Sequence, residues 1–156
     1  MPKKNQIIDL IVEDIIFPNK GIAYIDGKKV IIKNAIKGQK VRAKITRKRK
    51  DKIEATILEV LERSPIEKQA SCPHFGLCGG CSYQTLPYKE QLKLKEGLVK
   101  KLLDNAGIEG YDFLDILPSP SEYNYRNKME FSFGDVEKDG ELALGMHKVG
   151  AYYEMV

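Results

Sequence analysis

Apolar and polar residues alternate along much of the first sixty or so residues, which is the period of a β-strand with one buried face. The clearest example is KVRAKITRKRKDKIEATILEV, residues 40–60, which predicts a two-stranded hairpin. Three earlier segments predict further strands, and the first hairpin carries the turn signal Asp26-Gly27: IIDLIVEDI, GIAYIDG and KKVIIKNAI. Five short strands in this length favour a small all-β barrel, because closure leaves no sheet edge exposed.

The pattern changes after Ser64-Pro65, which we take as the boundary between a module over residues 1–64 and a second over residues 65–156. Apolar residues recur at helical spacing from Tyr88 to Ala106, and Gly107 is placed to cap the helix. The segments KMEFSFG, ELALGM and AYYEMV predict an antiparallel meander. The second module is therefore expected to be α+β. Because the chain stops inside a predicted strand, we expect it to be a piece of a longer protein.

Charge divides the chain at the same point. The net charge is +4 overall, but residues 1–63 carry a net +8 and the remainder a net −4. The basic first module is a candidate surface for a polyanion. Its most basic stretch is the tip of the predicted hairpin, with Arg42 and Lys44 leading to Arg47, Lys48, Arg49 and Lys50. The hypothesis is phosphate contact with RNA; the alternative is a solvated turn. No aromatic-rich strand offers base stacking, so we expect sequence-independent contact.

All three cysteines lie in one short segment rich in glycine, as Cys72, Cys78 and Cys81 with the spacing C-x5-C-x2-C. An odd, clustered set argues against a secreted disulfide scaffold and favours a thiolate metal site over inert packed thiols. Two sites remain open on spacing alone. His74 could complete a Cys3His zinc site, or the cysteines could hold a 4Fe-4S cluster whose fourth ligand lies elsewhere.

Targeting signals are not visible. The apolar runs are only a few residues long, too short for a membrane span, and the N-terminal MPKKNQIIDL lacks the apolar core of a signal peptide. We therefore expect a cytoplasmic protein without membrane contact.

Several motifs, in order along nearly the whole chain, resemble one family. Residues 5–64 resemble a TRAM domain, an OB-like RNA-binding β-barrel, through GIAYIDGKKVII, GQKVRAKI and KIEATILEVLERSP. CPHFGLCGGCSYQ resembles the cysteine motif of the bacterial RNA (uracil-5-)-methyltransferases, and LPYKEQLKLKEGLVKKLL resembles the helix after it. NYRNKMEFSFG and LGMHKVGAYYEMV resemble segments of their central domain. The chain is thus similar to the N-terminal part of a 23S ribosomal RNA uracil-5-methyltransferase.

The resemblance implies a 4Fe-4S cluster held by Cys72, Cys78 and Cys81, with the fourth cysteine beyond Val156 and His74 a bystander. It implies methyl transfer from S-adenosylmethionine to uracil C5, after a cysteine thiolate attacks C6. The nucleophile and the Rossmann-like cofactor domain are absent here, so we expect no catalytic or S-adenosylmethionine-binding residue in this chain and no activity from it alone.

Further expectations follow for partners. Arg126 and Lys128, in the Y-R-N-K segment, are candidate RNA contacts or order a domain interface; the alternative is a simple loop. Ribosomal RNA is the expected partner, and the protein is expected to be monomeric. A rival interpretation is a stand-alone RNA-binding module with a structural zinc. A radical S-adenosylmethionine enzyme would need C-x3-C-x2-C, which these cysteines do not match.

Overall fold

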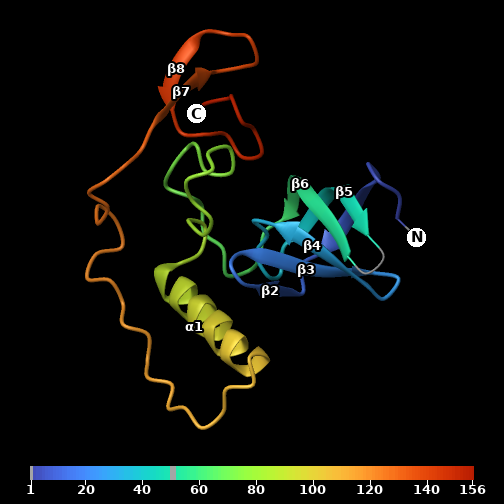
Figure 1. The fold of residues 1–156 in the computed structure, drawn as a ribbon, viewed down its shortest axis with the longest axis vertical. Helices are drawn as coiled ribbons and strands as arrows, with labels where there is room; N and C mark the ends of the chain where they lie inside the picture. The colour runs from blue at the N-terminus through green and yellow to red at the C-terminus, as the bar shows by residue number, and fades with distance from the viewer. Residues whose placement is uncertain (1, 50–51) are drawn as a thin grey trace. The chain divides into compact units, whose positions relative to one another are not determined.

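A six-stranded sheet forms the first part of the computed structural model, which describes residues 2–49 and 52–156. Its strands, in chain order, are β1 (Ile7–Ile11), β2 (Asp14–Ile16), β3 (Lys20–Ile25), β4 (Lys28–Lys33), β5 (Lys40–Arg49) and β6 (Lys52–Glu62). Figure 1 shows these strands curling around one another. The predicted all-β first module is confirmed, and so is the turn at Asp26-Gly27, where both residues have the positive φ of a tight hairpin turn.

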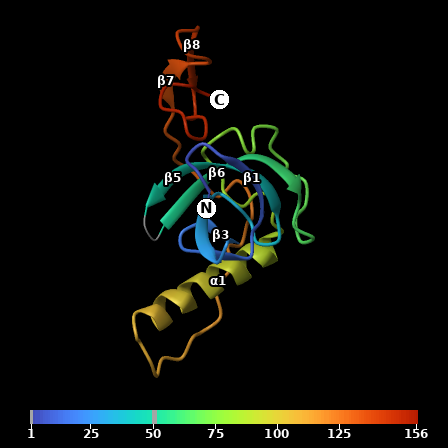
Figure 2. The same ribbon diagram turned by 90° about the vertical axis from the view of Figure 1, so that its right-hand side faces the viewer.

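The number of strands differs from the prediction, because the segment expected as one strand over residues 7–15 is two. The N–H of Val12 donates to the carbonyl of Gln39, 2.8 Å away, whereas the next N–H, that of Glu13, donates to Ile22 at 2.8 Å. The chain therefore leaves β5 and joins β3 between consecutive residues. Since β1 and β2 are the two edges of the order β1-β5-β6-β4-β3-β2, this switch brings the sheet back on itself (Figure 2).

The inward residues of these strands make one apolar core. The predicted alternation is visible in the burial of β5, where Val41, Ala43 and Ile45 are fully buried and the residues between them are exposed or half-buried. Strand β4 pairs in parallel with β6 through Val30 and Ile53, which joins the two hairpins into one sheet. The core cluster consists of Leu10, Val12, Ala23, Val30, Ile32, Ala35, Val41, Ala43, Ile45, Ile53 and Ala55.

The predicted helix is present as α1 (Tyr88–Asn105). Gly107 ends it with φ +68°, and the N–H of Ile108 donates to the carbonyl of Leu103 at 3.1 Å, the pattern of a Schellman cap. Lys101 on this helix donates to both carboxylate oxygens of Asp14 in β2, at 2.8 Å. In the part of the chain that the structure describes, no helix is long and apolar enough to cross a membrane.

The C-terminal segments form less sheet than expected. Only β7 (Ser132–Asp135) and β8 (Leu142–Gly145) pair as antiparallel strands. The third predicted strand, AYYEMV, makes only isolated bridges, Asp135 with Glu154 and His147 with Met155. The meander prediction is therefore wrong for its last strand. The bridge to Asp135 is parallel and the one to His147 antiparallel, so the last segment lies between two partners instead of extending one ladder.

The chain divides into two compact units, and each unit combines two separate stretches of the sequence. One comprises Met1–Glu67 with Leu92–Ile116, and the other Lys68–Gln91 with Leu117–Val156. Residues just past the predicted boundary belong to the first unit, because the buried side chain of Gln39 donates to both carboxylate oxygens of Glu67, at 3.1 and 3.0 Å. We call these the barrel unit and the cysteine unit.

Candidate nucleic-acid interface and cysteine loop

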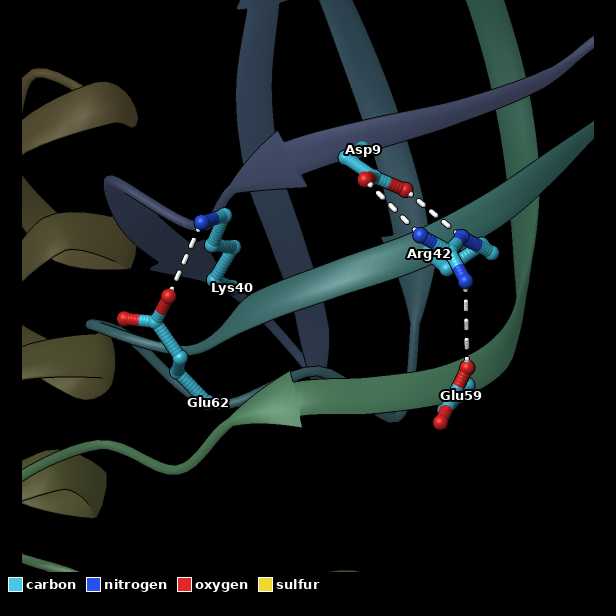
Figure 3. A network of polar contacts seen from close by, with 5 residues as sticks. All are labelled: Asp9, Lys40, Arg42, Glu59 and Glu62. Atoms are coloured by element: carbon cyan, nitrogen blue, oxygen red, sulfur yellow. Dashed lines mark hydrogen bonds and ion pairs between the residues drawn. The ribbon is translucent and has the colours of Figure 1, made fainter.

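The outer face of β5 begins with two cations that are each matched by acids on neighbouring strands. Arg42 donates to the two carboxylate oxygens of Asp9, at 2.9 and 3.1 Å, and lies 3.4 Å from Glu59 (Figure 3). Lys40 contacts Glu62 at 2.8 Å. Asp9 is the cross-strand neighbour of Arg42 on β1, and Glu59 and Glu62 lie opposite Arg42 and Lys40 on β6.

These ion pairs shift the pKa values of the groups that form them. The hydrogen bond from Arg42 holds the pKa of Asp9 below its ordinary value of 3.8, and the same bond raises the pKa of Arg42. Hydrogen bonding to Glu62 likewise raises the pKa of Lys40. Arg42, predicted from the sequence as an RNA contact, therefore lies in a network in which its guanidinium already has anionic partners. A phosphate would have to compete with both carboxylates for it.

The second half of β5 has a different surrounding. The neighbours of Lys44 are Ile7 and Thr56, neither of them acidic. Arg47 lies opposite Glu54, and Lys48 lies opposite Ile53. Arg49 faces another cation, Lys52, across the end of the hairpin, and all three tip residues Arg47, Lys48 and Arg49 are exposed. Lys50, also predicted as a contact, lies outside the described residues.

A hollow lies on the same outer face and is lined by residues of four strands, β3 to β6. Its volume is about 260 Å³, and it is lined by Lys20, Ile31, Lys33, Thr46, Glu54, Ala55 and Thr56. Lys20 and Lys33 are direct cross-strand neighbours. Glu54, the one acid of the lining, bonds to Lys52 at 2.8 Å. That hydrogen bond, with Arg47 and Lys33 nearby, lowers the pKa of Glu54.

Lys20 and Lys33 were not among the residues that the sequence singled out. The alternation in KKVIIK places Lys33 on the outer face, and this signal was available. What the sequence could not supply is the register that sets Lys33 beside Lys20, and the order of strands that brings both near β5 and β6.

The other two predicted RNA contacts lie in the cysteine unit. Arg126 and Lys128 are both exposed and belong to the irregular segment before β7. Lys128 forms an ion pair with Glu130 at 2.7 Å, and both side chains are 80% exposed. The other predicted RNA contacts all belong to the barrel unit.

The cysteine segment is a loop shaped by its own backbone. The N–H of Cys78 donates to the carbonyl of His74 at 2.9 Å, and the N–H of Cys72 donates to the side-chain oxygen of Gln84 at 2.9 Å. The N–H of Gly80 points to the sulfur of Cys78, 3.3 Å away. A Cβ on Gly80 would meet that sulfur at 3.4 Å and the terminal methyl group of Met146 at 3.3 Å. Hydrogen bonds from an N–H to sulfur stabilise a thiolate.

A second set of hydrogen bonds joins the loop to a later part of the chain. The N–H of Gly79 donates to the carbonyl of His147 at 2.9 Å, and the N–H of Val149 donates to Leu77 at 2.7 Å. Residues 77–79 are thereby bridged to residues 147–149, far along the chain but within the same unit.

The donor chemistry of the loop fits a thiolate-bound metal, but the geometry does not assemble one. The three cysteines are unpaired; Cys72 and Cys78 are half-buried and Cys81 is exposed. Among residues 2–49 and 52–156, no group of three or more Cys, His, Asp or Glu side chains is gathered closely enough to hold a metal ion. His74 shapes the loop through its carbonyl, and neither the zinc site nor the cluster is tested by this arrangement.

Part of the barrel unit matches a known domain family. Residues 3–58 match the TRAM domain, so the curled sheet is similar to that domain. The boundaries include all of β1–β5 and the first part of β6, and thus all of the core cluster described above.

Proteins named as RNA methyltransferases match almost the whole chain. The chain is 49% identical over 154 residues to an uncharacterized RNA methyltransferase of Clostridium tetani, covering 99% of this chain and 34% of that protein. A counterpart in Clostridium acetobutylicum is 48% identical, with 99% and 34% coverage. The chain spans about a third of the length of these curated relatives. It is therefore similar to about a third of each of these proteins named RNA methyltransferase.

A solved structure shares the fold. The crystal structure of the Pyrococcus abyssi tRNA (uracil-54, C5)-methyltransferase in complex with S-adenosyl-L-homocysteine superimposes with a TM-score of 0.57, covering 95% of this chain and 30% of that one. At 20% identity this likeness concerns the fold of the chain.

Proposed function

We propose that this chain is the RNA-binding and iron–sulfur part of an S-adenosylmethionine-dependent RNA uracil-5-methyltransferase that acts on ribosomal RNA. The observation that carries the proposal is the 49% identity over 154 residues to a protein named RNA methyltransferase. The TRAM match over residues 3–58 and a net charge of +8 on residues 1–63 support RNA as the ligand of the barrel unit. The proposed protein works as a monomer in the cytoplasm.

The uracil specificity rests on fold and motif. The Pyrococcus abyssi enzyme of similar fold is named for the C5 of a uracil and was crystallised with the demethylated form of S-adenosylmethionine. The cysteine motif resembles that of the ribosomal RNA enzymes. This likeness of sequence is the ground for proposing ribosomal RNA instead of transfer RNA as the substrate.

The cofactor part of the proposal assigns Cys72, Cys78 and Cys81 to a 4Fe-4S cluster, with a fourth ligand outside these 156 residues. Three thiols in one loop, none of them in a disulfide, and an amide directed at one sulfur support this assignment. When bound, the cluster supplies a cross-link between distant parts of the loop. The chain's own contribution is the N–H of Gly80 and the bridge from residues 77–79 to 147–149, which orient the thiols.

The same assignment bears on activity. Methyl transfer to uracil C5 requires a nucleophile that adds to C6 and a base that removes the C5 proton. If all three cysteines bind the cluster, none is left as the nucleophile. We therefore propose that these 156 residues alone do not methylate RNA.

The test is to purify the chain without oxygen, measure iron, sulfide and zinc, and titrate it into labelled RNA. The expected result is iron with sulfide, a broad visible absorbance that air bleaches, and RNA binding that weakens steeply with salt. Stoichiometric zinc without colour would overturn the cluster and favour a zinc-stabilised module with His74. Absence of RNA binding at low salt would overturn the RNA-binding role.

A further inference from the structure

Three lysines lie in a row across the outer face of the barrel unit. Lys20 on β3 is the cross-strand neighbour of Lys33 on β4. Lys33 and Thr56 directly follow the paired residues Ile32 and Ala55, and both line the same hollow. Thr56 is in turn the cross-strand neighbour of Lys44 on β5. The order of the four strands, β5-β6-β4-β3, thus sets Lys44, Lys33 and Lys20 in sequence across the sheet. We call these three residues the lysine row.

The lysine row lowers the stability of the protein without a ligand, because it places like charges side by side. Like charges directly opposite each other on neighbouring strands destabilise a sheet, and Lys20 with Lys33 is such a pair. Within the described residues, neither Lys20 nor Lys44 forms an ion pair, and the hydroxyl of Thr56 makes no hydrogen bond. The single acid of the hollow, Glu54, is held by Lys52 and lies near Arg47 as well as Lys33. One carboxylate is thus shared by three cations, so the row keeps a net positive charge.

We propose that the lysine row is the phosphate-contacting track of the barrel unit and binds the backbone of a single-stranded RNA segment, with Thr56 as a hydroxyl contact. The inference rests on the proposed RNA-binding function and says which face carries it. Neighbouring strands lie about 4.8 Å apart, so the row spans about 14 Å. At about 3.4 Å per stacked nucleotide, this length covers roughly four nucleotides, about the smallest site of a single-stranded RNA-binding OB fold.

The row differs from the hairpin tip in burial, because Arg47, Lys48 and Arg49 are all exposed. Lys20 and Lys44 are half-buried and Lys33 is exposed, and all three are in the ladder of the sheet. Arg42 and Lys40, in the first part of β5, are excluded from the track because Asp9, Glu59 and Glu62 hold them. The RNA is therefore expected to cross β5 at Lys44 and not at its first residues.

The test uses the whole chain and a fluorescein-labelled single-stranded RNA of mixed sequence, about 12 nucleotides long, with binding followed by anisotropy from about 50 to 200 mM salt. The variant combines Lys20→Gln, Lys33→Gln and Lys44→Gln. Its control combines Lys4→Gln, Lys95→Gln and Lys138→Gln, three exposed lysines outside the row with the same change in charge. Circular dichroism confirms that both fold.

The slope of log K against log salt is expected to fall by about 2 in the row variant, about 0.7 for each lost phosphate contact, and to change little in the control. Equal slopes for the two variants, with binding by the unmodified chain intact, would overturn the lysine row and leave RNA binding to the hairpin tip. No binding by the unmodified chain would overturn the proposed function itself.

A second variant is expected to strengthen RNA binding instead of weakening it. Glu54→Gln removes the one acid of the hollow, so RNA binding should strengthen severalfold, whereas Glu137→Gln, at an exposed turn of the cysteine unit, should not change it. Unchanged or weaker binding by Glu54→Gln would contradict an RNA track over this hollow.

Discussion

The barrel unit and the cysteine unit differ in how much apolar surface they bury. Nearly all the buried apolar residues of the described chain belong to the barrel unit, and only Leu86 and Met155 lie in the cysteine unit. The cysteine unit instead exposes large side chains on one face of its hairpin, where Phe133 and Leu144 are neighbours with 72% and 60% of their surfaces exposed. The barrel has a core of its own, and the cysteine unit does not.

The difference teaches what each unit depends on. A curled sheet buries one face of every strand against the others, so alternation alone generates a core. The cysteine unit is held mainly by backbone bonds, such as those joining residues 77–79 to 147–149. Small units with little core are usually stabilised by a metal or another cross-link. This contrast agrees with the proposed cluster and suggests where each unit can be perturbed separately.

The largest effect is expected from the barrel core. Ile45 is completely buried among the strands, so Ile45→Ala should destabilise the barrel unit by about 2–5 kcal/mol, through lost burial and the cavity left behind. The measurement is hydrogen exchange of the β4–β6 amides. Ile7→Ala, at a residue 55% exposed, is the control and should change stability by no more than about 0.5 kcal/mol. Equal losses in the two variants would contradict a core confined to the inner face.

The next effect concerns the cysteine unit. Cys78→Ser removes one thiol and should release the bound iron, which opens the loop to proteolysis while the exchange protection of the barrel stays unchanged. His74→Ala is the matched control, because it retains iron if His74 is a bystander. Retained iron and unchanged proteolysis in Cys78→Ser would mean that the thiols are not ligands. Loss of zinc in His74→Ala would support the zinc site instead.

The smallest effect lies on the paired part of the outer face. Since Arg42 lowers the pKa of Asp9 below 3.8, the ionised carboxylate stabilises the barrel above that pH, and this contribution is lost as pH falls through the lowered pKa. Asp9→Asn should lower the thermal midpoint slightly at neutral pH and make no difference in strong acid. Circular dichroism at several pH values measures this.

The control for this pair is Glu137→Gln in the cysteine unit, which should not change the barrel's midpoint at any pH. A difference between Asp9→Asn and the unmodified chain that persists in strong acid would show that Asp9 stabilises the barrel by something other than its charge.

Local patterns predicted the elements well and their partners poorly. The alternation in residues 40–60 gave β5 and β6, and the apolar spacing with Gly107 gave α1 and its cap. The break between β1 and β2 is not predicted, because it is a change of partner strand between the consecutive residues Val12 and Glu13. The last predicted strand failed for a related reason: its hydrogen bonds go to two different segments.

The cysteine loop shows the same contrast: its local pattern was predictable, and its tertiary partner was not. The spacing of Cys72, Cys78 and Cys81 singled out the loop, and the glycines near Cys78 indicated its tight backbone. The contact of this loop with residues 147–149 was not visible, because nothing in either segment specifies the other.

The sequence by itself determined the basic character of the barrel, the alternation that makes it a barrel, and the thiols that mark the second unit. Only the tertiary structure decided which cations are paired. Arg42 meets Asp9, which is 33 residues away, whereas the cross-strand neighbour of Lys20 is another cation, Lys33. The physical reason is that alternation is a property of neighbouring residues. Register and strand order instead depend on how the whole chain closes around its core.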